Sequence, residues 1–164
     1  MTVQYDIINL TKKENRQVTP MKIQIKKIRD GAVIPTRGSD NAAGYDLYAC
    51  LDAPVTVPPH TTVRIGTGIT AAIPEGYFGA CFARSGIAVR QGLRPANCVG
   101  VVDSDYRGEY IVALYNDSEE SRTVQNGDRI AQLVIMPFLT VEFEQVDSLP
   151  ETGRGSGGFG STGK

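Results

Sequence analysis

Hydrophobic and polar residues alternate in short segments along most of this chain. In residues 21–28, MKIQIKKI, Ile23 and Ile25 repeat with a period of two, which predicts a β-strand. The other β-rich segments are 45–50, 55–57, 62–69, 76–83, 98–102, 110–116 and 130–137. Only residues 85–91 favour a helix, and that helix is short.

Turn-forming residues separate these segments, as at 58–59 (PP), 74–76 (PEG), 116–118 (NDS) and 126–128 (NGD). The 18 glycines and 9 prolines of the chain suit many turns. Many short strands with so little helix predict an all-β fold of the barrel or jelly-roll type.

The length of 164 residues suits one domain, with a distinct segment at each end. We interpret residues 1–20 as a polar N-terminal extension and 21–151 as the β-barrel domain. Residues 152–164, TGRGSGGFGSTGK, form a flexible glycine-rich tail. Its glycine spacing resembles a P-loop, but such a loop needs a strand before it and a helix after it, so we do not expect one.

The net charge is −1, so no broad basic surface predicts binding to nucleic acid or to an anionic membrane. The three cysteines and one histidine form no zinc-ligand pattern, and an odd cysteine count argues against a disulfide framework. No apolar run reaches the ~20 residues that a membrane helix needs. We therefore expect a cytoplasmic protein.

Five clusters carry a resemblance to a known family. They are AAGYDLYA at 42–49, ARSGIA at 83–88, NCVGVVDSDYRGE at 97–109, GDRIAQLV at 127–134, and the glycine-rich tail. In order and spacing these clusters resemble the five motifs of the trimeric dUTPases, from about residue 21 to the end. The resemblance implies a β-barrel or jelly-roll-like fold (β-clip) with one short helix per chain. It also implies a homotrimer.

The third cluster implies a catalytic Asp103 that orients the attacking water, a role that suits a carboxylate because it accepts hydrogen bonds and protons. Tyr106 would lie under the deoxyribose and exclude a 2′-hydroxyl. The hairpin around 97–110 would read uracil, with substrate contacts from Asn97, Gly100 and Val102. Taken alone, Asp103 also suits a turn and Tyr106 a half-buried strand.

In the second and fourth clusters, Arg84, Ser85, Gly86 and Gln132 would bind phosphate. An N-cap serine beside a surface arginine is the alternative for Arg84 and Ser85. In the first cluster, Asp46 would support Mg²⁺ through a water, since Mg²⁺ usually keeps waters and takes few protein ligands. A plain strand-edge aspartate is the alternative there.

In the tail, the resemblance implies that Phe159 stacks on uracil and that Arg154 pairs with the γ-phosphate. Further phosphate donors would come from Gly157, Gly158, Gly160 and Ser161. Ordering such a tail costs about 1–2 kcal/mol of backbone entropy per residue, so only the complete substrate would hold it closed. We expect a lid, whereas composition alone also suits a disordered linker.

The implied activity is hydrolysis of dUTP to dUMP and pyrophosphate, by Mg²⁺-assisted attack of water on the α-phosphorus. The three sites would lie between subunits, with clusters one, two and four from one chain, cluster three from another and the tail from the last. A dCTP deaminase-related enzyme is one alternative. A nucleotide-sensing regulatory protein, docking through residues 1–20, is another.

Overall fold

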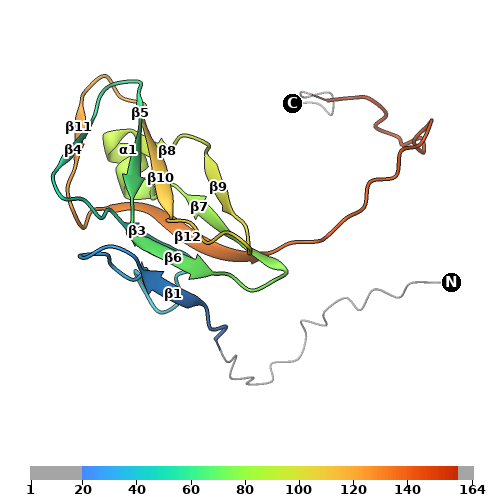
Figure 1. Cartoon of the computed structure of the whole chain (residues 1–164). Coiled ribbons are helices and arrows are strands. Elements are labelled where there is room, and N and C mark those ends of the chain that lie inside the picture. The colour runs from blue at the N-terminus through green and yellow to red at the C-terminus, as the bar shows by residue number, and fades with distance from the viewer. Residues whose placement is uncertain (1–19, 159–164) are drawn as a thin grey trace.

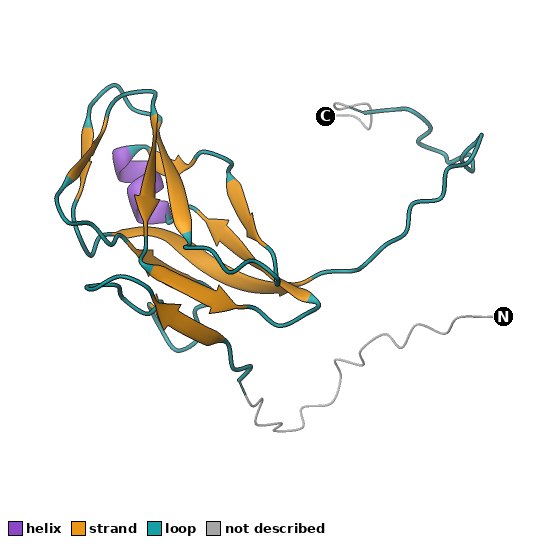
Figure 2. Cartoon of the chain, viewed as in Figure 1, coloured by secondary structure: helices purple, strands orange, loops and turns teal. Residues whose placement is uncertain are grey.

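A computed structural model describes residues 20–158 of the chain. These residues form twelve β-strands and one α-helix (Figures 1 and 2). The elements are β1 Gln24–Lys27, β2 Thr36–Arg37, β3 Tyr45–Tyr48, β4 Val55–Val57, β5 Thr62–Gly66, β6 Ile69–Ala72, β7 Tyr77–Phe82, α1 Ser85–Gln91, β8 Leu93–Pro95, β9 Val99–Val102, β10 Ile111–Asn116, β11 Arg122–Val124 and β12 Arg129–Pro137.

The strands are arranged in four antiparallel sheets. The largest has the order β2-β3-β12-β7-β9, and a second has the order β5-β10-β8. Two-stranded sheets are formed by β1 with β6 and by β11 with β4. The nine-residue strand β12 lies at the centre of the largest sheet, where it pairs with both β3 and β7. Both of these neighbouring strands lead into residues of the candidate site.

One hydrophobic core receives side chains from all four sheets, and residues 20–158 have the all-β fold that the sequence predicts. Fully burying one large aliphatic side chain stabilises a fold by about 1.5–3 kcal/mol. The most completely buried aliphatic side chains are Leu47, Val57, Ile65, Ile69, Leu114 and Ile130.

The predicted helix is confirmed at 85–91, and most of the predicted strands are present with ends that differ by a residue or two. The strand predicted over 62–69 ends at Gly66 as β5, and a second strand, β6, begins at Ile69 and belongs to a different sheet. The chain turns between them at Gly68, which has a φ of 68°. A Cβ at Gly68 would lie 2.8 Å from the Cβ of Ala32 and 2.9 Å from the Sγ of Cys50, so only glycine fits this turn.

The alternating segment 21–28 forms a strand only over Gln24–Lys27, where it pairs with β6. Three two- or three-residue strands, β2, β8 and β11, were not predicted. Beyond β12, residues 138–158 contain no helix or strand and lead away from the body of the domain (Figure 1). In the described part of the chain, no helix is long and apolar enough to cross a membrane.

Candidate active site

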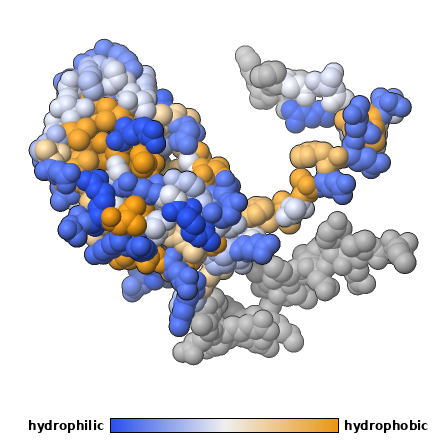
Figure 3. Space-filling model, in the orientation of Figure 1, coloured by the Kyte–Doolittle hydropathy of each residue, from blue (hydrophilic) through white to orange (hydrophobic). Residues whose placement is uncertain are grey.

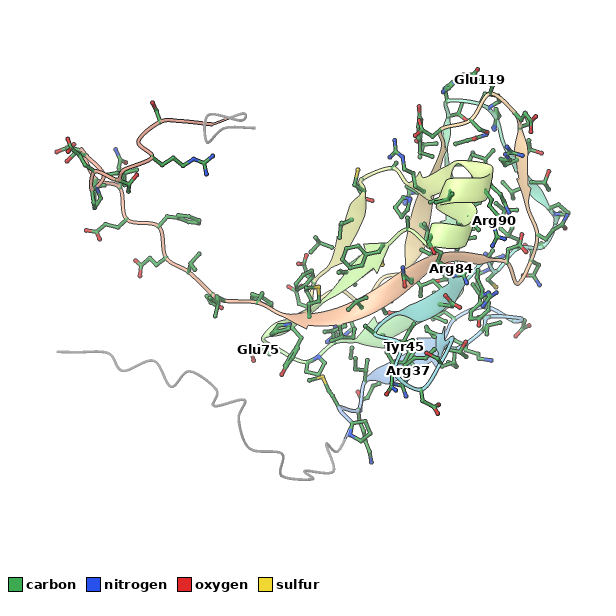
Figure 4. All side chains as sticks on the ribbon, turned by 180° about the vertical axis from the view of Figure 1, so that it is seen from behind. Arg37, Tyr45, Glu75, Arg84, Arg90 and Glu119 are labelled. Carbon is green, nitrogen blue, oxygen red and sulfur yellow. The ribbon has the colours of Figure 1, made fainter. Side chains whose placement is uncertain are left out.

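A buried carboxylate lies between two guanidinium groups where β3, β12 and α1 meet. Asp46, in β3, is only 8% exposed. Its Oδ1 accepts a 2.6 Å hydrogen bond from Nε of Arg84, and its Oδ2 accepts one of 3.2 Å from Nη1 of Arg129. Two positive charges against one negative charge leave this cluster cationic, which suits it to bind an anion such as phosphate. Figure 4 shows Arg84 beside the start of α1.

Gln132 belongs to the same cluster because of its place in the largest sheet. It lies opposite Asp46 of β3 on one side and opposite Phe82 of β7 on the other. Its Nε2 donates a 2.8 Å hydrogen bond to the carbonyl oxygen of Ala83, directly before Arg84. A Cβ at Gly44 would collide with the carboxamide of Gln132, so a glycine is needed beside it. The first, second and fourth sequence clusters therefore meet.

The start of α1 differs from one of the alternatives drawn from sequence. Arg84, not Ser85, is the N-cap residue, and it makes no side-chain capping bond. Ser85 is the first residue of the helix and is exposed, followed by the partly buried Gly86. The hydroxyl of Ser85 is thus not used as a helix cap, contrary to the N-cap alternative, and Arg84 is not a free surface residue because it pairs with Asp46.

A pocket of about 330 Å³ lies between β9 and β10. Five of the residues singled out in the third cluster line it together: Asn97, Gly100, Val102, Asp103 and Tyr106. A Cβ at Gly100 would lie 3.2 Å from the Cβ of Cys81 and 3.4 Å from Nδ2 of Asn97, so a larger residue would crowd this wall. The volume is at the lower end of the range for small-ligand sites, about 300–1,000 Å³.

Two further residues of this pocket were interpreted from sequence only as parts of strands. Tyr110 is buried, and its hydroxyl has no hydrogen-bond partner among residues 20–158. Burial, with a smaller contribution from Cys81, raises the pKa of Tyr110 to about 12. Burial also raises the pKa of the Cys81 thiol to about 11. Both side chains are therefore neutral at physiological pH, and no local sequence pattern distinguishes them from core residues.

Arg84 and Asp103 lie toward different ends of β7. Val99 of β9 pairs with Phe82, while Val102 pairs with Gly79. Arg84 comes after the Phe82–Val99 end of this paired region, and Asp103 comes after the Gly79–Val102 end. At about 3.3 Å per residue, the two ends are about 10 Å apart. Within one protomer, Asp103 is thus not brought together with Arg84, Asp46 or Gln132.

The described part of the tail, residues 152–158, lies apart from both groups of residues (Figure 1). Nε of Arg154 donates a 2.7 Å hydrogen bond to the carbonyl oxygen of Gly157, within a turn of the tail itself. The described chain ends at Gly158, and Phe159, Gly160 and Ser161 lie outside the described residues. The proposed contacts of the tail with substrate therefore stay predictions.

Few side chains of this site could bind the Mg²⁺ that the family resemblance implies. Residues 20–158 contain no group of three or more His, Cys, Asp or Glu side chains placed to hold a metal. The carboxylate of Asp46 is a suitable hard oxygen ligand, but it is one group and it is paired with arginines. These residues fit a Mg²⁺ ion that arrives with substrate phosphates as its main ligands, and they do not form an independent metal site.

The fold and the two groups of residues define an all-β protein with a cationic cluster for an anion and a separate pocket of small-ligand size. Comparison with protein families gives a more specific result. The family model described as dUTPase matches residues 30–163. The chain belongs to the dUTPase family.

Relatives and solved structures agree with this assignment. The deoxyuridine 5'-triphosphate nucleotidohydrolase of Desulfitobacterium hafniense (strain DSM 10664 / DCB-2) is 48% identical over 146 residues, covering 87% of this chain and 97% of the relative. The protein of the same name from Wolinella succinogenes is 45% identical, covering 90% and 98%. The dUTPase of Staphylococcus bacteriophage 80alpha with dUpNHpp has a TM-score of 0.80 at 30% identity, covering 87% and 99%.

Proposed function

We propose that this chain carries out the reaction for which its family is named, the hydrolysis of dUTP to dUMP and pyrophosphate. The observation that supports this most directly is the shared pocket of Asn97, Asp103 and Tyr106. In this pocket the Asn97 side chain can hydrogen-bond to a base, and the Tyr106 ring can pack against a sugar. Asp103 adds a carboxylate. The cationic cluster at Arg84 supplies the complementary site for phosphate.

The proposed chemical step is direct, in-line attack of water on the α-phosphorus. Asp103 holds the water by a hydrogen bond and accepts its proton as the new O–P bond forms. The bond between the α-phosphorus and the bridging oxygen breaks, and pyrophosphate leaves with that electron pair. Catalysis then depends on positioning and on neutralising charge, which are the main contributions that proteins make to phosphoryl transfer.

Arg84 and Arg154 would neutralise the phosphate oxygens, and the exposed Ser85 hydroxyl with the Gly86 amide would add donors. Bound with the triphosphate, Mg²⁺ would supply further neutralisation of phosphate charge. The dUTPase of phage phi11 of S. aureus, 26% identical with a TM-score of 0.70, is described as having a structural Mg(II) ion. In this chain we assign Asp46 to the outer, water-mediated surroundings of such an ion.

The tail is proposed to close over bound substrate. Phe159 would cover the base, while Arg154 and the donors of Gly157, Gly158, Gly160 and Ser161 would contact the phosphates. The position of residues 152–158 away from the body in Figure 1 supports a segment that closes only when substrate is present. Closure would exclude bulk water from the reacting phosphate.

We further propose that three chains share three sites. The separation of Asp103 from Arg84 within one protomer supports this, because a second chain can supply the missing group. The segment after β12 gives independent support, since Leu139, Phe143 and Leu149 are 87%, 94% and 81% exposed. Figure 3 shows apolar atoms along this segment, far from the core. Large exposed apolar side chains typically mark contacts between chains.

A regulatory role is the second candidate, because phage dUTPases related in structure are described as controlling transfer of virulence genes. In this chain it would require a nucleotide-dependent protein partner. A pull-down with and without a non-hydrolysable dUTP analogue tests this role. Capture that does not change with the analogue would contradict it.

The experiment that tests the proposed activity is pyrophosphate release from dUTP, dTTP, dCTP and UTP, with and without Mg²⁺. We expect release from dUTP that is strongly favoured over the other three and depends on Mg²⁺. Ammonia release from dCTP would instead identify a deaminase. Absence of pyrophosphate release from dUTP would contradict the proposal.

A further inference from the structure

A β-bulge in β12 determines where Arg129 points. In a regular strand Arg129 would lie three positions from Gln132 and would face the opposite side of the sheet. The register of β12 against β3 shifts between Arg129 and Ala131, so that Arg129 pairs with Tyr48 while Gln132 pairs with Asp46. Asp46 and Tyr48 face the same side, and the bulge therefore returns Arg129 to that side, where it contacts Asp46.

The two arginines that contact Asp46 are not equivalent. The side chain of Arg84 is 21% exposed and makes the shorter contact, whereas that of Arg129 is 51% exposed. Each occupies a different oxygen of the carboxylate. Both also line a pocket of about 200 Å³ beside α1. Asp46 therefore keeps one charged partner even if the other arginine moves away.

In the proposed function Arg84 binds a phosphate while its Nε–H contacts Asp46, so its guanidinium is shared between the carboxylate and the phosphate. A buried carboxylate that loses its only charged partner is strongly destabilised, because it has given up water without compensation. Arg129 removes this penalty by remaining on the other oxygen. Without it, Asp46 would compete with the phosphate for Arg84.

We propose that Arg129 is a positioning residue for substrate binding, which keeps Asp46 paired while Arg84 is shared between that carboxylate and a phosphate of the triphosphate. This inference rests on the proposed function and adds a residue to it. Arg129 itself does not contact the substrate in this arrangement. Its effect on the nucleotide is transmitted through Asp46 and Arg84.

The test combines substitutions of both partners with binding measurements on the full-length protein. Affinity for an imido analogue of dUTP is measured by calorimetry for the wild type, Arg129→Gln, Asp46→Asn and the double variant. We expect Arg129→Gln to weaken binding by about 10- to 100-fold, the range for losing a charged hydrogen-bond partner. In the Asp46→Asn background the same change should alter affinity by less than about twofold, because the side chain at position 46 then carries no negative charge for Arg129 to pair with.

Two controls separate positioning from folding. Arg129→Lys retains the positive charge and should restore most of the affinity. Arg94→Gln removes an arginine that is paired with the exposed Asp117 at 3.6 Å, away from the cluster, and should leave binding unchanged. Equal melting temperatures for these variants would confirm that the loss in Arg129→Gln is not a loss of fold.

A direct observation of Arg84 makes the inference falsifiable even if a variant fails to fold. In nitrogen NMR of the wild type, the Arg84 Nε–H signal should shift when the analogue saturates the site, since the guanidinium gains a phosphate acceptor. An unchanged signal at saturation would overturn the inference, as would an equal effect of Arg129→Gln with and without the Asp46 charge. Either result leaves the proposed function standing if the wild type hydrolyses dUTP, whereas an inactive wild type removes that function itself.

Discussion

Gly108 lies against the phenol ring of Tyr106, so closely that no side chain fits between them. A Cβ added at Gly108 would collide with the Tyr106 hydroxyl and would lie 2.9 Å from its Cε2. The ring is also held by a 3.1 Å hydrogen bond from the Tyr106 hydroxyl to the carbonyl oxygen of Glu109. The glycine therefore leaves the space that is occupied by the ring proposed to select deoxyribose.

Gly108→Ala should displace this ring and relax sugar selection. Losing the hydrogen bond and the packing of the ring is expected to lower kcat/KM for dUTP about tenfold, with a smaller effect on UTP. The measurement is the ratio of kcat/KM for dUTP and UTP by pyrophosphate release. Gly38→Ala is a matched control, because an added Cβ there has open space around it. An unchanged ratio in Gly108→Ala would exclude this role of Tyr106.

Asp103→Asn should separate binding from chemistry. The amide has nearly the shape of the carboxylate but cannot accept the proton of the attacking water, so turnover should fall by about 100- to 10,000-fold. Binding of an imido dUTP analogue, measured by calorimetry, should change little. Normal turnover in this variant would disprove the assignment of Asp103.

Removal of residues 152–164 should give a folded protein with little activity. The described part of this tail bonds within itself and lies outside the hydrophobic core, so its loss leaves the core contacts intact. Circular dichroism and a thermal melt would establish folding, and pyrophosphate release would establish activity. If the truncated protein unfolds, the tail is part of the fold and is not a lid.

Mixing two inactive variants tests whether the sites are shared. Asp103→Asn keeps the tail, and the truncated chain keeps Asp103, so a mixed trimer contains some sites with both elements intact. Random assembly at equal amounts would restore about a quarter of the sites, because Asp103 and the tail come from different chains. Activity is measured after the two variants are unfolded and refolded together. No recovery in a mixture shown to contain mixed trimers would contradict shared sites.

The three cysteines should differ in reactivity. Cys98 is exposed, Cys50 is buried, and burial raises the pKa of Cys81 from 9.0 to about 11. The thiolate is the reactive form, so at pH 8 a two-unit rise lowers the reactive fraction of Cys81 about a hundredfold. As pH rises toward 11, Cys81 should become reactive. Mass spectrometry after iodoacetamide treatment at pH 8 should find Cys98 modified first, and equal rates for Cys81 would contradict the burial argument.

Much of the fold follows from local sequence, because alternation and turn residues act over a few positions. The segments 55–57 and 85–91 have the bounds expected from sequence. The end of β5 at Gly66 could not be predicted in this way. It depends on close packing of Gly68 against Ala32 and Cys50, which are distant in sequence.

The site was predictable to a similar degree. The resemblance to five motifs identified Asn97, Asp103 and Tyr106, which line one pocket together. No motif assigned Arg129 to this cluster, although it pairs with Asp46. The cause is a bulge in a strand of ordinary composition, which no local pattern reveals.

The turn at Thr67 and Gly68 affects how the domain unfolds. It passes the chain from one sheet to another within two residues. The Thr67 hydroxyl donates a 2.5 Å hydrogen bond to the carbonyl oxygen of Tyr110, while the amide of Tyr110 donates one of 2.9 Å to Ile69. Neither sheet can melt without breaking the bonds that anchor the other. We therefore expect thermal denaturation to be cooperative across this junction, with the pocket that Tyr110 lines lost in the same event.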